Sequence, residues 1–399
     1  MINKKALELG SNPSTIRDLF EYGRKRKQQI GEENVFDFSI GNPNVPTPEC
    51  VTNALINLLQ TKDPSFLHGY TSAVGDKNTR DAISNFLNKT YNANTDSNLI
   101  YLTVGAAASL TSTLHALLNE GDEVIVFAPF FPEYKVFIEK AGGKVVVVQS
   151  LEETFLPNLQ ELEKVISNKT KAVIINSPNN PTGVVLDKNE IEKLSSILNK
   201  KQNELNKEIF LISDEPYREL IYSNIEYPFI TNYYDNSIVC YSFSKSISLP
   251  GERIGYILVN PNCIQCKNVF LAICGSARSL GYVCAPSLFQ HVIPYCLGKT
   301  SDLTIYKQNR DLLYSTLSEY GYKVVKPDGA FYLFVKALEQ DANKFSEVAK
   351  NFELLLVPSD SFGTSGYVRI SYCVSTSQIK NSLPAFKKLI EYYKNKGEI

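Results

Sequence analysis

The residues best suited to chemistry in this sequence surround Lys245, which follows Ser242 and Ser244 and precedes Arg253. A lysine amine condenses with an aldehyde to form a Schiff base. The two hydroxyl groups and the guanidinium can hold the phosphate of the same molecule. The segment therefore predicts an anchor for pyridoxal 5′-phosphate (PLP), which carries an aldehyde and a phosphate. A Ser-x-Ser-Lys run alone is also typical of a surface loop with an exposed lysine, so the interpretation depends on two further segments.

These two segments are polar and follow predicted strands. The apolar run 171–175 is rich in β-branched residues and predicts a buried strand, and asparagine and proline residues then turn the chain at 176–183. Asp214 follows a second apolar run, 209–212. A carboxylate just past the end of a strand points into the crevice where α/β enzymes bind ligands. The first segment alone would be an ordinary strand-to-helix turn, but the three together favour a shared site.

Taken together, the segments resemble the fold-type I, class I/II aminotransferases over nearly the whole chain. The residues that match the family pattern in type, order and approximate spacing are Asn180, Asp214, Tyr217, Lys245, Arg253 and Arg369. The resemblance implies PLP as cofactor and an α/β fold, the PLP-dependent transferase fold type I. In that fold a large domain has a mostly parallel central sheet flanked by helices, and a smaller domain is α+β. The matching motifs are much less specific for the substrate.

The resemblance also implies roles for individual side chains. Lys245 would hold PLP and, once freed by substrate, act as a general base at the substrate Cα, a role that a lysine pKa lowered by burial suits. Asp214 would pair with the ring nitrogen and keep it protonated, so that the ring withdraws electrons from Cα. Tyr217 and Asn180 would hydrogen-bond the phenolate oxygen of the ring.

A second group of residues is expected to bind the rest of the cofactor. Gly105, Ala106 and Ala107 lie between a predicted strand and a predicted helix, where backbone amides form an anion site. The resemblance makes this turn the main phosphate cradle; since this chain has mostly alanine there, backbone donors would dominate. Phe131 aligns with the aromatic residue that stacks on the ring, and it offers stacking without a polar edge. Phe130 is the alternative for this role.

Substrate and partner contacts follow from the resemblance as well. Tyr70 lies in a loop that, in the family, reaches the phosphate of the neighbouring subunit, which implies a homodimer with shared active sites. Arg369 matches the clamp for the substrate α-carboxylate, which a guanidinium grips through two parallel hydrogen bonds. Gly41 lies in the loop that closes over substrate and could donate its amide to that carboxylate. We hypothesise that Arg278, of the same or the partner subunit, binds a distal carboxylate; an arginine facing solvent is the alternative.

We therefore expect an aminotransferase that moves an amino group from an L-amino acid to a 2-oxo acid such as 2-oxoglutarate by a ping-pong mechanism. Aspartate is the favoured donor, with alanine or aromatic donors close behind. A PLP-dependent C–S β-lyase would share the same core residues but release pyruvate and ammonia without an acceptor. A PLP-binding transcription regulator would need an N-terminal DNA-binding module, whereas the segment before Gly41 predicts a single helix. The intact site residues argue against a non-catalytic remnant.

The composition of the chain narrows the kinds of partner, compartment and metal site that we expect. Lys and Arg number 41 and Asp and Glu 42, so the formal net charge of −1 favours neither nucleic acid nor an anionic membrane as partner. No apolar run approaches a membrane span, and the N-terminus lacks the apolar core of a secretory signal. The eight cysteines are scattered, which fits a reducing cytoplasm. Cys263 and Cys266 lack a second pair at zinc spacing, and the histidines lack ligand spacing, so we predict no metal.

The elements that must position these residues alternate along the middle of the chain. Strands are predicted at 99–104, 124–127, 145–148, 173–175, 209–212, 238–241 and 254–259. Strands that alternate with helices imply βαβ units and a mostly parallel sheet. Further helices are predicted at 11–29, 301–320 and 378–396. We expect three parts: an N-terminal arm and helix at 1–48 that packs with the small domain, a large PLP-binding domain at 49–295 and a small C-terminal domain at 296–399.

Overall fold

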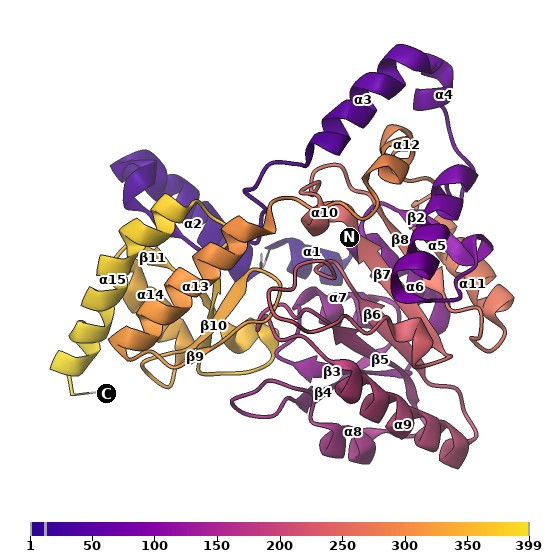
Figure 1. The fold of residues 1–399 in the computed structure, drawn as a ribbon. Coiled ribbons are helices and arrows are strands. Elements are labelled where there is room, and N and C mark those ends of the chain that lie inside the picture. Colours follow the sequence, from indigo (N-terminus) through magenta and orange to yellow (C-terminus); the bar gives the residue numbers. More distant parts are fainter. Residues whose placement is uncertain (1, 12–13, 398–399) are drawn as a thin grey trace.

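The fold is organised around a large and a small sheet, and the computed structural model describes residues 2–11 and 14–397. Within these residues a seven-stranded sheet forms the larger part and a four-stranded sheet the smaller part, at the left of Figure 1. The α-helices are α1 (Lys4–Ser11), α2 (Thr15–Ile30), α3 (Glu49–Thr61), α4 (Pro64–His68), α5 (Lys77–Tyr91), α6 (Ala106–Leu117), α7 (Glu133–Lys140), α8 (Leu159–Val165), α9 (Lys188–Leu205), α10 (Phe243–Ser246), α11 (Cys266–Ser279), α12 (Ser287–Cys296), α13 (Leu303–Tyr320), α14 (Ala342–Lys350) and α15 (Thr376–Asn395).

The larger, central sheet is mixed and mostly parallel. Its strands, in spatial order, are β2 (Ile100–Thr103), β8 (Gly255–Val259), β7 (Ser237–Ser242), β6 (Phe210–Asp214), β5 (Thr170–Asn176), β3 (Glu123–Ala128) and β4 (Lys144–Gln149). Strand β8 runs antiparallel to both of its neighbours, and the other pairs are parallel. The predicted fold class, with its mostly parallel central sheet, is confirmed.

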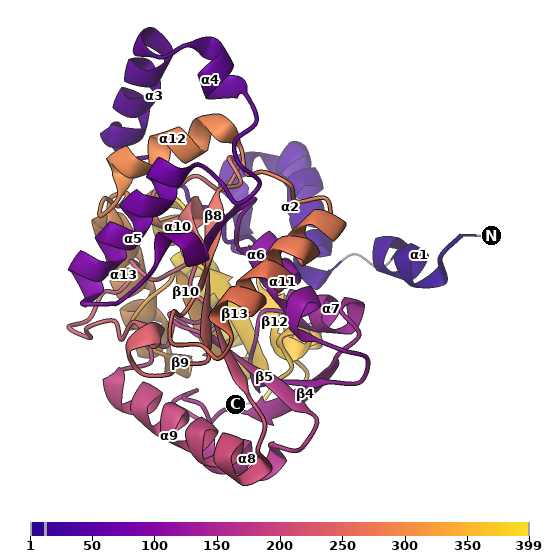
Figure 2. The same ribbon diagram turned by 90° about the vertical axis from the view of Figure 1, so that its right-hand side faces the viewer.

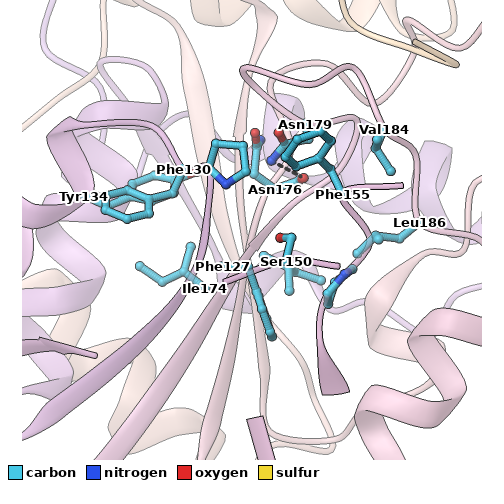
Figure 3. Close-up of a pocket in the computed structure, with 13 residues that line it drawn as sticks. Phe127, Phe130, Tyr134, Ser150, Phe155, Ile174, Asn176, Asn179, Val184 and Leu186 are labelled. Atoms are coloured by element: carbon cyan, nitrogen blue, oxygen red, sulfur yellow. Dashed lines mark hydrogen bonds between the residues drawn. The ribbon is translucent and has the colours of Figure 1, made fainter. Parts of the chain in front are cut away.

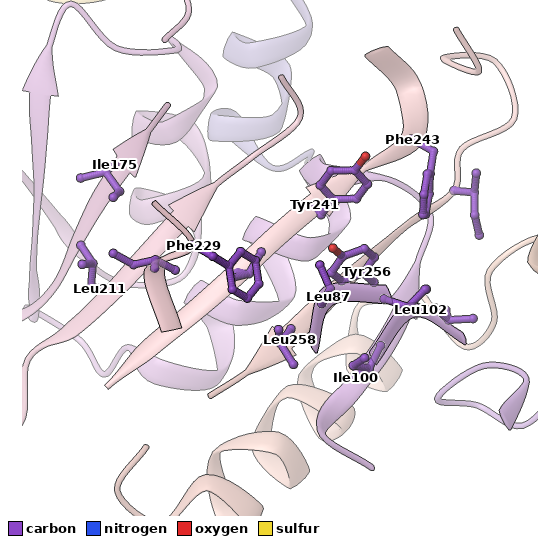
Figure 4. Close-up of a cluster of buried hydrophobic side chains, with 14 of the residues drawn as sticks. Leu87, Ile100, Leu102, Ile175, Leu211, Phe229, Tyr241, Phe243, Tyr256 and Leu258 are labelled. Carbon is purple, nitrogen blue, oxygen red and sulfur yellow. The ribbon is translucent and has the colours of Figure 1, made fainter. Parts of the chain in front are cut away.

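Alternating side chains of the central sheet build two hydrophobic cores, one on each face. On β3, Ile125 and Phe127 join the core covered by α3, α5, α9 and α12, while Val124 and Val126 join the core covered by α6, α7 and α11. Figure 4 shows the first core, with Tyr241 and Tyr256 side by side on neighbouring strands. Both faces are buried, which explains why these strands are continuous apolar runs in the sequence.

The smaller sheet is antiparallel and carries the C-terminal helices. Its strands, in spatial order, are β12 (Val357–Pro358), β13 (Tyr367–Ser371), β10 (Tyr332–Lys336) and β9 (Val324–Val325). The N-terminal arm joins this part: β1 (Phe36–Asp37) pairs in parallel with β11 (Leu354–Leu355), and Arg26 of α2 forms a 2.5 Å ion pair with Glu353. These contacts join α2 and β1 to the last hundred residues of the chain.

The predicted elements differ from the observed ones mainly at the N-terminus. The helix expected at 11–29 is observed as α2 from Thr15, and residues 12 and 13 of that prediction lie outside the described part of the chain. Helix α1 precedes it, has no buried residue and projects from the body of the molecule (Figure 2). Among the described residues, none of the helices has the length and apolar character that a bilayer crossing requires.

Candidate active site

Three neighbouring strands of the central sheet end at the same edge and place the polar residues of the site. Asn176 of β5 pairs with Asp214 of β6, and Asp214 pairs with Cys240 of β7. Because parallel strands share their carboxyl ends, the loops that follow them meet at this edge. Ser242 ends β7, and its side chain caps α10 by accepting a hydrogen bond from the amide of Ser244.

A cavity of about 300 Å³ lies at this edge, between the central sheet and the small sheet. Its size suits a small ligand. The predicted site residues that line it are Gly41, Ala106, Ala107, Phe131, Asn180, Asp214, Tyr217, Ser242, Ser244, Lys245, Arg253 and Arg369. The fold therefore brings together residues that are spread over most of the sequence.

Lys245 is held at the cavity by one backbone contact. Its Nζ donates a hydrogen bond to the carbonyl oxygen of Gly41 at 2.7 Å and lies 5.6 Å from the centre of the Phe331 ring. Burial lowers the pKa of the Lys245 amine to about 8, with further lowering from the charges of Arg253 and Arg369. A buried amine with a lowered pKa is a better nucleophile and base near neutrality than an exposed one.

The rate at which PLP is incorporated into cofactor-free protein is expected to rise with pH through a midpoint near the pKa of Lys245, about 8. Only the neutral amine attacks an aldehyde, so lowering the pKa moves the rise to lower pH. Rapid-mixing absorbance measurements over a pH series would give the midpoint. A rate that keeps rising toward the ordinary lysine value of 10.5 would contradict the burial of this amine.

The two carboxylate oxygens of Asp214 differ in their contacts. Tyr134 donates its hydroxyl hydrogen to Oδ2 at 2.5 Å, whereas Oδ1 is buried without a hydrogen-bond partner among residues 2–11 and 14–397. Burial raises the pKa of the Asp214 carboxyl to about 7; the hydrogen bond from Tyr134 lowers it and the nearby charge of Glu215 raises it. A buried, unpartnered carboxylate oxygen costs free energy unless a ligand donates to it. The protonated nitrogen of the PLP ring is such a donor.

Tyr217 and Asn180 retain donors for a ligand oxygen. The hydroxyl groups of Tyr217 and Tyr332 lie 2.8 Å apart, and burial raises the pKa of Tyr217 well above its usual value, which keeps the phenol neutral. The side-chain oxygen of Asn180 accepts a hydrogen bond from Arg369 at 3.1 Å, so its amide nitrogen still has hydrogens to donate. Both side chains can therefore donate to the phenolate oxygen of PLP.

The other end of the cavity suits a phosphate. Gly105, with φ of 92°, caps the N-terminus of α6, and a Cβ there would lie 2.6 Å from a guanidinium nitrogen of Arg253. Arg253 itself adopts a left-handed φ of 53°, and its Nη1 donates to the carbonyl oxygen of Pro250 at 2.9 Å. Ser242 and Ser244 hydroxyl groups lie 2.6 Å apart beside it. A helix N-terminus, an arginine and two hydroxyls form an anion site, so these residues fit the phosphate of PLP.

Arg369 is a buried cation without a carboxylate partner among residues 2–11 and 14–397. It donates to Asn180 and, at 2.5 Å, to the carbonyl oxygen of Ser39, while none of the residues that the structure describes accepts a hydrogen bond from its Nε. The ring of Tyr332 lies 4.6 Å from the guanidinium carbon. Because buried charges are normally paired, this guanidinium favours an anionic ligand.

Two predicted site residues lie away from the cavity. Tyr70 is 97 % exposed, and Arg278 is exposed on α11. Their proposed roles involve a neighbouring subunit, so both stay predictions.

The sequence did not indicate several residues that the structure places near the site, among them Tyr332, Ile16 and Tyr134. Tyr332 contacts both Tyr217 and Arg369, Ile16 of α2 lines the cavity, and Tyr134 bonds Asp214. A Cβ at Gly41 would overlap the hydroxyl of Tyr332, which explains the glycine there. Each partner is distant in sequence, so no local pattern indicated these contacts.

Fold and site together define a PLP-dependent enzyme of fold type I. The sequence model of the family "Aminotransferase class I and II" matches residues 33–386. The chain therefore belongs to the class I and II aminotransferase family, is a PLP-dependent aminotransferase, and acts on an amino acid and a 2-oxo acid. Bound PLP supplies an electron sink for the substrate Cα. The predictions of family, cofactor and aminotransferase activity are confirmed.

Individual relatives agree on the reaction class but differ in the donor that their names give. The chain is 33% identical to an aspartate aminotransferase of Thermotoga maritima, covering 92% of this chain and 95% of the relative. It is 29% identical to aromatic-amino-acid aminotransferase 2 of Thermococcus litoralis, covering 95% and 96%. A crystal structure of an amino transferase from Eubacterium rectale superposes with a TM-score of 0.96 at 52% identity, covering 98% and 99%.

Proposed function

We propose that the chain transfers the amino group of an L-amino acid, with aspartate favoured, to a 2-oxo acid such as 2-oxoglutarate by a ping-pong mechanism in the cytoplasm. The observation that carries the proposal is that Lys245 and Arg369 line the same cavity. The buried guanidinium would hold the α-carboxylate while the amine moves a proton at Cα. The name of the Thermotoga maritima relative supports aspartate as donor.

The remaining site residues receive the roles expected from the sequence. Asp214 would pair with the ring nitrogen, and Tyr217 and Asn180 would donate to the phenolate oxygen. Phe131 would stack on the ring, and Gly41 would contact the α-carboxylate. The phosphate would be held by Gly105, Ala106, Ala107, Ser242, Ser244 and Arg253.

We also propose a homodimer and the division of the chain at 1–48, 49–295 and 296–399. The exposed ring of Tyr70 and the neighbouring exposed apolar residues Ile56, Leu59 and Phe66 support a subunit contact at α3 and α4. A solution mass equal to one chain of 44.7 kDa would contradict the dimer.

Aspartate is expected to convert the bound cofactor faster than alanine or phenylalanine does. If Arg278 binds a distal carboxylate, the Arg278→Ala variant should lose about tenfold or more of the preference for aspartate over alanine, because a charge pair is removed. Stopped-flow absorbance without an acceptor gives each rate constant. An unchanged preference would remove Arg278 from the site, and a faster reaction with alanine or phenylalanine would overturn aspartate as the favoured donor.

A further inference from the structure

Tyr134 has no assigned role, although it is bonded to a residue of the site. It is buried in the first turn of α7, and its hydroxyl donates to Oδ2 of Asp214 at 2.5 Å. The second oxygen of Asp214, Oδ1, is buried and has no hydrogen-bond partner in the described part of the chain, and Asp214 lines the cavity of about 300 Å³. One oxygen of the carboxylate is therefore fixed by the protein and the other is left for a ligand.

The ring of Tyr134 is fixed by aromatic contacts. It stacks on Phe130 with ring centres 6.5 Å apart and planes at 15°, and Figure 3 shows the two rings lying against each other. Phe131 meets it edge-on, with ring centres 5.7 Å apart. The small cavity in Figure 3, about 30 Å³, leaves room for little more than one water molecule beside the ring. Tyr134 thus contacts the proposed stacking residue as well as Asp214, and its hydroxyl has little freedom to move.

The burial and the charges around Asp214 favour its protonated form, so a fixed hydrogen-bond donor is needed to favour the ionised form. Burial raises its carboxyl pKa to about 7, and the charge of Glu215 raises it further, whereas the hydrogen bond from Tyr134 lowers it. Glu215 is itself paired with Arg218 at 2.5 Å. Burial also raises the pKa values of Tyr134, Tyr217 and the Cys240 thiol, so these neighbours stay neutral. Tyr134 is the hydrogen-bond donor that the structure gives the Asp214 side chain.

We propose that Tyr134 is a positioning residue for Asp214: its hydroxyl fixes one carboxylate oxygen and keeps the carboxylate ionised, so that the other oxygen can accept from the ring nitrogen of PLP. The inference rests on the proposed role of Asp214. A tyrosine that merely satisfies its own hydroxyl in the core is the competing explanation.

The Tyr134→Phe variant removes the hydroxyl and keeps the ring. Tyr234→Phe is a matched control, because the Tyr234 hydroxyl is also buried in the large domain but donates to the backbone carbonyl of Ile209 at 2.6 Å. Thermal unfolding of both variants would measure the general cost of losing a buried hydroxyl. Asp214→Asn provides the reference for loss of the carboxylate.

In Tyr134→Phe the dissociation constant of PLP is expected to rise about tenfold near pH 7, since a hydrogen bond to a charged group is lost. Without that bond the pKa of Asp214 rises above its value of about 7, so the carboxyl stays protonated to higher pH. The loss of PLP affinity on acidification should therefore begin at higher pH than in the unmodified protein. The nitrogen-15 chemical shift of labelled PLP should move toward the unprotonated ring. Tyr234→Phe should leave all three measurements unchanged.

The outcomes separate the inference from the proposed function. If Asp214→Asn weakens PLP binding and shifts the nitrogen-15 signal while Tyr134→Phe behaves like Tyr234→Phe, the role of Tyr134 is overturned. If Asp214→Asn changes neither measurement, the proposed role of Asp214 is overturned as well. Both roles are supported if Tyr134→Phe loses PLP affinity at higher pH than the unmodified protein does and also shows, in weaker form, the nitrogen-15 change of Asp214→Asn.

Discussion

The Lys245→Ala variant is expected to convert bound PLP with an amino-acid donor about 10⁴-fold more slowly than the unmodified protein. That factor is the upper end of what a positioned general base contributes. Lys245 is the lysine among the described residues that line the cavity, so no neighbouring amine can replace it there. The measurement is the single-turnover change in cofactor absorbance after mixing with donor.

Lys245→Arg is the matched comparison, because arginine keeps the positive charge but does not lose its proton in proteins. It should be as slow as Lys245→Ala if proton transfer is the function of the side chain. Added small primary amines should partly restore the alanine variant, since they can enter the space that the side chain leaves. An alanine variant within tenfold of the normal rate would mean that another group moves the proton.

Arg369→Lys is expected to reduce kcat/KM for every amino-acid donor by about 10²- to 10³-fold. Truncating one member of a buried, hydrogen-bonded charge pair typically costs about 2–5 kcal/mol, and a lysine cannot form the two parallel bonds that a guanidinium makes with a carboxylate. PLP affinity should change less than kcat/KM does, because Arg369 touches the cofactor site through Asn180 and lies away from the phosphate end of the cavity. Steady-state kinetics and PLP titration measure the two effects separately.

Arg310→Lys is a suitable control for this substitution. Arg310 is also a buried arginine, on α13, where it donates to the carbonyl oxygen of Pro327 at 3.1 Å and lies over the Tyr222 ring, away from the cavity lining. Its replacement should lower thermal stability without changing selectivity for a carboxylate. If Arg369→Lys kept normal kcat/KM with amino acids, the carboxylate clamp would have to be another residue.

The sequence predicts the central sheet well because both faces are buried. Continuous apolar runs such as 238–241 correspond to observed strands, here β7 (Ser237–Ser242). The polar residues that end these strands lie together because parallel strands share an edge, and this places Asp214 beside the segment of Lys245. Residue type and order along the chain were therefore sufficient to predict that Asp214 and Lys245 belong to one site.

The features of the fold and the site that the sequence did not predict depend on contacts that no local pattern encodes. The antiparallel direction of β8 is set by its pairing with β2 and β7, not by its own residues. Strands β1 and β11 have only two residues each and pair across most of the chain. The hydrogen bond from Tyr134 to Asp214 joins residues 80 positions apart, and a tyrosine in a helix is by itself an ordinary core residue.

The most direct test of the account is the absorption spectrum of the purified protein during titration with an L-amino acid and no acceptor. We expect the band of bound PLP to be replaced by that of the amino form of the cofactor, with one equivalent of 2-oxo acid released per site. Adding 2-oxoglutarate should restore the first band. Continuous release of pyruvate and ammonia from cysteine or cystathionine, with the band unchanged, would instead identify a C–S β-lyase and contradict the assignment of this cavity to transamination.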